Sequence, residues 1–164
     1  MGLAFAAATA RVVDAAAKSG LATPLLFTIA RSKNANVVRY CARVSAKGLE
    51  RARPIDAFWL MLAEDGRREE LSWAERQLAY GFAVSNATER ACTLRLTAFD
   101  ARPVQVERSA DGYRALVTVA GQRALLKRIF VQTSEGALLP SVQHLDLFGT
   151  TPGGAPLSER LTAR

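Results

Sequence analysis

A chain of 164 residues, of which 49% are hydrophobic, is long enough for one domain with a single core, and no second domain is required. Its 22 Lys and Arg against 15 Asp and Glu give a net charge of +7. The arginines are scattered, however, and no helix-turn-helix, zinc-finger or aromatic-basic RNA motif is present, which argues against a nucleic-acid partner and indicates a basic, soluble surface.

The N-terminal segment, residues 1–23, is rich in alanine and predicts a short helix. Charged residues interrupt it at Arg11, Asp14 and Lys18, so it cannot be a membrane span, and we expect no transmembrane segment. It also lacks the basic start and long apolar centre of a signal peptide, and export is therefore poorly supported. These features leave both the cytoplasm and the periplasm open.

A β-hairpin is predicted next, with strands over Leu25–Ile29 and Val37–Ser45 joined by the polar connection Arg31–Asn36. In the second strand, alternation places Cys41 on the opposite face from Tyr40 and its apolar neighbours.

An uninterrupted apolar run, Phe58–Leu62, predicts a strand that is buried on both faces or covered by a helix on one. The charged corner Glu64–Glu70 ends this strand at a turn containing Asp65 and Gly66. Everything that follows is expected to be strand, apart from one helix.

That helix is predicted from Ser72 to Tyr80, because Ser72 and Glu75 have the spacing of a capping box. Trp73 and Leu78 are expected to pack onto the sheet, since so short a helix needs tertiary contacts. Gly81 is expected to end the helix in the left-handed conformation.

The C-terminal half alternates short apolar strands with turn residues at near-even spacing, which is typical of an antiparallel meander. The expected strands are Phe82–Val84, Cys92–Phe99, Val104–Arg108, Tyr113–Val119, Ala124–Thr133 and Leu138–Phe148, with a turn at Asp100–Pro103. Residues 24–149 would form one β-rich domain, and residues 150–164 a loose tail.

We therefore predict a mainly β fold: an antiparallel sheet that curls into a barrel or half-barrel, lipocalin-like in outline, because closure removes exposed strand edges. A flat two-sheet sandwich is the alternative. An eight-stranded barrel can be filled by its side chains or can hold one small ligand, and the sequence leaves both open.

The two cysteines, Cys41 and Cys92, are predicted on opposite faces of their strands, which disfavours a disulfide. Cys41 lies between Arg39 and Arg43, and neighbouring guanidinium groups can depress the pKa of a thiol. The only histidine, His144, is distant in sequence, so a catalytic Cys41–His144 pair is not favoured.

Three strings resemble a family of bacterial domains of unknown function (DUF4833): LFTIARSKNANVVRY (26–40), FWLMLAEDGRREELSWAERQLAYGF (58–82) and LLPSVQHLDLFG (138–149). The likeness extends from about Leu25 to Gly149. This family carries no established activity, so the resemblance implies a domain and not a function. Ala30 and Cys41 stand where the family commonly has acidic residues, and Asp56 where it commonly has histidine.

The candidate binding site combines the hairpin tip with the charged corner. If both lie at one end of the barrel, they form a mixed-charge mouth that could hold an anionic or zwitterionic head group, with Phe58, Trp59 and Tyr80 covering an apolar tail. The predicted ligand-binding residues are Arg31, Lys33, Asn34, Asn36, Trp59, Glu64, Arg67 and Tyr80, with Ser32, Asp65 and Arg68 in the same polar set. In the alternative interpretation, Asn34 and Asn36 only shape turns and the charges form weak surface pairs.

We predict non-catalytic binding of a small amphipathic or anionic ligand, or of a protein partner. The alternative is a small enzyme that uses Glu64, Arg67 and Tyr80, although no reaction can be named. A deep apolar cavity would favour the ligand, and a packed interior with an exposed apolar patch would favour the protein partner. No metal-ligand set and no phosphate loop is present in the sequence, so we expect no metal and no cofactor.

Overall fold

The computed structural model describes residues 22–134 and 141–162. The expected N-terminal helix lies outside these residues, except for Ala22 and Thr23. Ala22 forms a single antiparallel bridge with Val44.

The described residues form thirteen strands and one helix. The first strands are β1 Leu25–Arg31, β2 Val37–Ala42, β3 Val44–Ser45, β4 Gly48–Leu49, β5 Ile55–Leu60 and β6 Arg68–Glu70. The helix α1, Trp73–Leu78, follows. The remaining strands are β7 Phe82–Ser85, β8 Ala91–Leu96, β9 Phe99–Ser109, β10 Gly112–Val119, β11 Gln122–Thr133, β12 Val142–Thr150 and β13 Pro156–Thr162.

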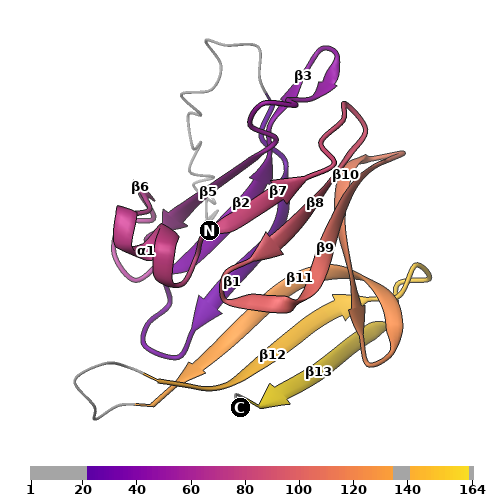
Figure 1. Cartoon of the computed structure of the whole chain (residues 1–164). Coiled ribbons are helices and arrows are strands. Elements are labelled where there is room, and N and C mark those ends of the chain that lie inside the picture. The colour runs from indigo at the N-terminus through magenta and orange to yellow at the C-terminus, as the bar shows by residue number, and fades with distance from the viewer. Residues whose placement is uncertain (1–21, 135–140, 163–164) are drawn as a thin grey trace, which may run out of the picture.

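Nine strands form a strongly curled half-barrel in the order β6-β5-β2-β1-β11-β10-β9-β8-β7 (Figure 1). The predicted β half-barrel is therefore confirmed. The prediction of a purely antiparallel sheet is wrong in one place, because β1 and β11 run parallel. Two antiparallel meanders, β1-β2-β5-β6 and β7 to β11, meet at this pair.

Strand β11 has neighbours on both of its edges. Residues 122–125 pair with β10 and residues 128–131 pair with β1, while β12 pairs along the strand from residue 125 to residue 133. β12 in turn pairs with β13. The segment expected as a loose tail therefore contains a strand, whose alternating Leu157, Glu159 and Leu161 the prediction overlooked.

One predicted turn is displaced. The β8–β9 turn lies at Thr97 and Ala98, because Leu96 pairs with Phe99, and β9 continues through the expected turn at residues 100–103. Pro103 is tolerated because the pairing of β9 with β10 begins only at Gln105, so its missing N–H removes no bond from that ladder.

Buried side chains fill the half-barrel. The rings of Phe27 and Tyr40 stack with centroids 4.6 Å apart, and Phe82 meets Tyr40 edge-on at 6.0 Å. The hydroxyl of Tyr40 donates to the backbone oxygen of Tyr80 at 2.8 Å, which joins the core to the end of α1. A continuous cluster of buried apolar residues extends from Leu26 to Leu147. Of the two outcomes left open by the sequence, the filled interior is the one observed.

Candidate functional site

The capping box of α1 forms as predicted. Ser72 Oγ accepts from the backbone N–H of Glu75 at 3.3 Å, and Glu75 Oε2 accepts from the backbone N–H of Ser72 at 2.8 Å. The helix begins at Trp73 and ends at Leu78. Gly81 does not adopt a positive φ. It is instead required for close approach, since a Cβ at this position would lie 1.7 Å from the backbone oxygen of Arg76.

The prediction that Trp73 and Leu78 pack onto the sheet is wrong. Trp73 is 78% exposed and Leu78 is 80% exposed. Ala74 and Gln77 are exposed as well. Trp73 and Gln77 are four residues apart, as are Ala74 and Leu78, so these four residues share one face of the helix. We call it the outward face.

Polar residues occupy the inward side of α1. Glu75 Oε1 accepts a hydrogen bond from the indole Nε1 of the buried Trp59 at 2.9 Å. Arg76 donates to the backbone oxygen of Leu71 at 3.1 Å and to Glu70 at 3.3 Å. A helix that anchors itself by charged groups and presents tryptophan and leucine to solvent reverses the usual arrangement of a surface helix.

Three of the predicted site residues meet under this helix. The Arg31 guanidinium lies 4.9 Å from the centroid of the Trp59 ring, and the rings of Trp59 and Tyr80 meet edge-on at 5.0 Å. Burial raises the pKa of Tyr80, against the effect of Arg31. Burial also acts to raise the pKa of Glu75, but hydrogen bonds from Ser72 and Trp59 and the charge of Arg31 lower it overall. The inward carboxylate is therefore well stabilised in its ionised form.

The hairpin tip and the charged corner lie at the same end of the sheet, because Asn36 Oδ1 accepts from the backbone N–H of Ala63 at 2.8 Å. Asn34 Oδ1 accepts from the backbone N–H of Asn36 at 3.1 Å. Asn34 thus shapes the turn in which it occurs, as the alternative interpretation expects, whereas Asn36 joins the hairpin tip to the charged corner. Lys33 is exposed.

Glu64 and Arg67 form an exposed ion pair at 2.6 Å, and Arg67 also contacts Asp65 and Glu69. The pKa of Arg67 is raised chiefly by its bond to Glu64. About half of each of these side chains is accessible, so solvent screens their attraction. Glu69 belongs to this network and pairs with Trp59 across β5 and β6, so the surface network borders the Arg31, Trp59 and Tyr80 contacts under α1.

The cysteines are both buried. Burial raises the pKa of Cys92 to about 11. Cys41 is 2% exposed, and its pairing partner Asp56 on β5 is bound by Arg68 at 2.9 Å and by Arg53 at 3.4 Å. His144 lies on β12 beside Asp146, at 3.6 Å.

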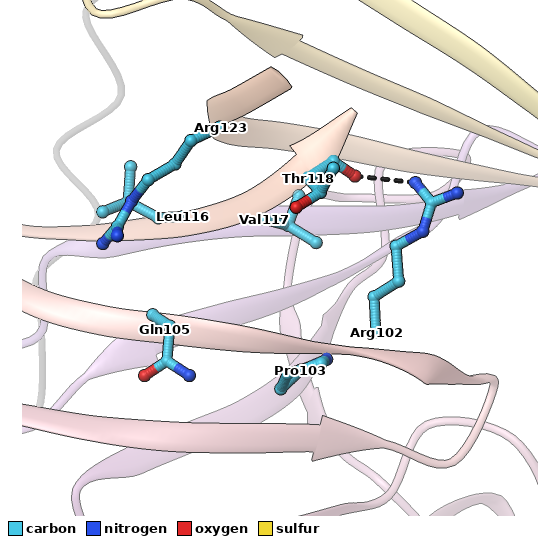
Figure 2. A pocket seen from close by; sticks show the side chains of 7 residues that line it. All are labelled: Arg102, Pro103, Gln105, Leu116, Val117, Thr118 and Arg123. Carbon is cyan, nitrogen blue, oxygen red and sulfur yellow. Dashed lines mark hydrogen bonds between the residues drawn. The ribbon is translucent and has the colours of Figure 1, made fainter. Parts of the chain in front are cut away.

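The surface of the described residues includes two shallow hollows. One, of about 230 Å³, lies over β9 and β10. Its lining residues are drawn in Figure 2, where Arg102 donates to the backbone oxygen of Thr118; the two atoms are 2.7 Å apart. Arg102 and the second cation, Arg123, both already contact carboxylates, Glu159 and Glu107. This hollow therefore offers an incoming anion no uncommitted cation.

The second hollow, of about 360 Å³, lies between α1 and the β7–β8 hairpin. It is lined by Arg76, Gln77, Phe82, Ala83, Arg95, Leu96, Thr97 and Asp100. Gln77 belongs to the outward face of α1 and Ala83 to the edge strand β7, so helix, hollow and strand edge form one continuous surface.

No group of three or more His, Cys, Asp or Glu within the described residues is placed to hold a metal ion. The same residues include no helix long and apolar enough to cross a membrane.

A family model described as a domain of unknown function, DUF4833, matches residues 27–160. No curated protein and no solved structure shows a significant match to the chain.

Proposed function

Because the chain belongs to a family described only as a domain of unknown function, DUF4833, we propose a function from its own residues: non-catalytic binding of a protein partner through the outward face of α1. The observation that carries this proposal is the exposure of Trp73 and Leu78 on a helix whose polar side is turned inward. Large exposed apolar side chains grouped on one element are typical of interaction sites.

Preorganisation supports the proposal. The capping box, the Trp59–Glu75 hydrogen bond and the Tyr40 bond to Tyr80 hold α1 in place. A partner would therefore meet a fixed surface and would lose little free energy in ordering it. Tryptophan is also among the residues that contribute most to binding energy when an interface buries them.

The filled interior favours a protein partner over a small amphipathic ligand, since the core cluster occupies the half-barrel. The proposed enzyme site at Glu64, Arg67 and Tyr80 receives no support from geometry, because Glu64 and Arg67 pair on the surface while Tyr80 packs against Trp59.

A peptide library displayed on phage, selected against the purified protein, tests the proposal. We expect selected peptides to lose binding to a Trp73→Ser, Leu78→Ser double variant and to retain it with Leu62→Ser, which changes an apolar residue that is 52% exposed elsewhere. Equal urea midpoints would show that all three proteins fold alike. Peptides that bind the double variant as well as the unchanged protein would refute the proposal.

A second candidate is a small anionic ligand at Arg31. One observation favours it: Arg31 Nε is buried and has no hydrogen-bond partner among the described residues. Titration calorimetry with inorganic phosphate and with acetate tests this candidate. Saturable binding that Arg31→Gln abolishes would support it, and absence of saturation at millimolar concentrations would contradict it.

A further inference from the structure

The half-barrel and its extension end in three strand edges within the described residues: β6, β7 and β13. An open edge presents unpaired N–H and C=O groups to any extended chain, and natural proteins commonly protect such edges with charged residues or proline. β6 is Arg68-Glu69-Glu70, and β13 contains Pro156, Glu159 and Arg160. Both of these edges therefore carry the usual protection.

β7 carries none of it. Its residues are Phe82-Ala83-Val84-Ser85, with no charge and no proline, and the last three are exposed. The strand pairs with β8 along all four residues and with no other strand in the described part of the chain. An uncharged, accessible edge of this kind is a template for adding a strand.

We propose that the open edge of β7 binds an extended segment of a partner protein as an additional strand, and that this segment alternates apolar with acidic residues. The inference rests on the proposed function and deepens it. It names the chemistry of the partner segment that would bind the surface formed by α1, the second hollow and the edge of β7.

The alternation follows from the two faces of the sheet. On the inner face, Phe82 packs edge-on against Tyr40 and Val84 pairs with the buried Leu94, so an added strand would meet apolar side chains there. On the outer face, Ala83 pairs with Arg95. Successive residues of an added strand point to opposite faces, which requires apolar residues to alternate with a second type.

Arg95 indicates the charge of the partner residues that would point to the outer face of the sheet. This exposed guanidinium forms no ion pair with the described residues, and the small side chain of Ala83 leaves it room to reach an added strand. Arg76 lines the same hollow but is already bound to Glu70, so Arg95 is the cation there that an incoming carboxylate can reach. Its positive charge is complementary to Glu or Asp on the partner.

A second copy of this chain is disfavoured as the occupant. Symmetric pairing of two β7 edges would bring both Arg95 side chains to the shared outer face, between two molecules that each carry +7. Like charges at an interface oppose association.

The test uses a capped hexapeptide of alternating valine and glutamate and the ¹⁵N-labelled full chain. We expect amide shifts concentrated in β7 and β8. A lysine-for-glutamate peptide should bind about tenfold more weakly, and an analogue N-methylated on alternate amides should not bind. Arg95→Gln should weaken binding, whereas Arg90→Gln, which changes an exposed arginine preceding β8, should leave it unchanged.

Equal binding of the N-methylated analogue, shifts centred on β6 or β13, or a concentration-dependent dimer with β7 amides protected would each overturn the inference. Failure of the two proposals can be distinguished. Selected peptides that need Trp73 and Leu78 without shifting β7 amides would refute strand addition alone. A valine-glutamate peptide that binds β7 while the Trp73→Ser, Leu78→Ser variant leaves all binding intact would refute the helix proposal alone.

Discussion

Replacing Glu75 by alanine is the sharpest test of how α1 is held. The Glu75 carboxylate accepts from Trp59 Nε1 at 2.9 Å and from the Ser72 backbone at 2.8 Å, so Glu75→Ala removes two contacts with separable costs. Leaving the N–H of the buried Trp59 without an acceptor costs about 1–3 kcal/mol. Loss of a helix cap costs about 1 kcal/mol. We therefore expect Glu75→Ala to lower the free energy of unfolding by about 2–4 kcal/mol.

Ser72→Ala separates the two contributions, because it removes only the Ser72 side chain and leaves the Trp59–Glu75 bond in place. We expect it to cost about 1 kcal/mol. Glu89→Ala, a change at an exposed carboxylate, serves as the control and should lie within about 0.5 kcal/mol of the unchanged protein. Urea unfolding followed by far-UV circular dichroism measures all three.

The pH dependence gives an independent check. The folded state lowers the pKa of Glu75 below its usual 4.5, so its stabilising contribution is present above that value and is lost as the pH falls through the folded pKa. The difference between the unchanged protein and Glu75→Ala should therefore shrink on acidification. A Glu75→Ala cost no larger than that of Ser72→Ala would refute the role of Trp59 in anchoring the helix.

Three further outcomes are expected. Gly81→Ala should cost about 1–3 kcal/mol in urea unfolding, because the new Cβ would overlap the backbone of α1 at Arg76. Gly153→Ala, at an open position without positive φ, should be nearly neutral, and equal costs would contradict the close approach. Bonds from Arg102 and a backbone amide lower the pKa of Glu159 to about 2, so Glu159→Gln should destabilise the protein at pH 7 and flatten the loss of stability between about pH 4.5 and pH 2; an unchanged acid profile would argue against this pair. Burial raises the pKa of Cys92 to about 11, and peptide mapping after labelling at pH 8 should find this thiol modified only when denaturant is added.

The sequence determined the local elements well. Period-two alternation in residues 92–96 and the apolar run Phe58–Leu62 identified their strands, because a buried face imposes such patterns, although β5 spans Ile55–Leu60 and leaves Leu62 exposed. The Ser72 and Glu75 spacing identified the start of the helix, since the capping box forms within four residues.

Only the tertiary structure decided how these elements meet. The parallel pairing of β1 with β11 joins residues about a hundred positions apart, and no local pattern encodes that choice. The direction in which α1 faces was predicted wrongly from the sequence, because the apolar Trp73 and Leu78 were expected to pack onto the sheet and are exposed instead. In the folded protein Glu75 accepts a hydrogen bond from the buried Trp59 N–H on the inward side, and Trp73 and Leu78 lie on the exposed side. This hydrogen bond joins residues sixteen positions apart, and such a contact is formed only once the chain has folded.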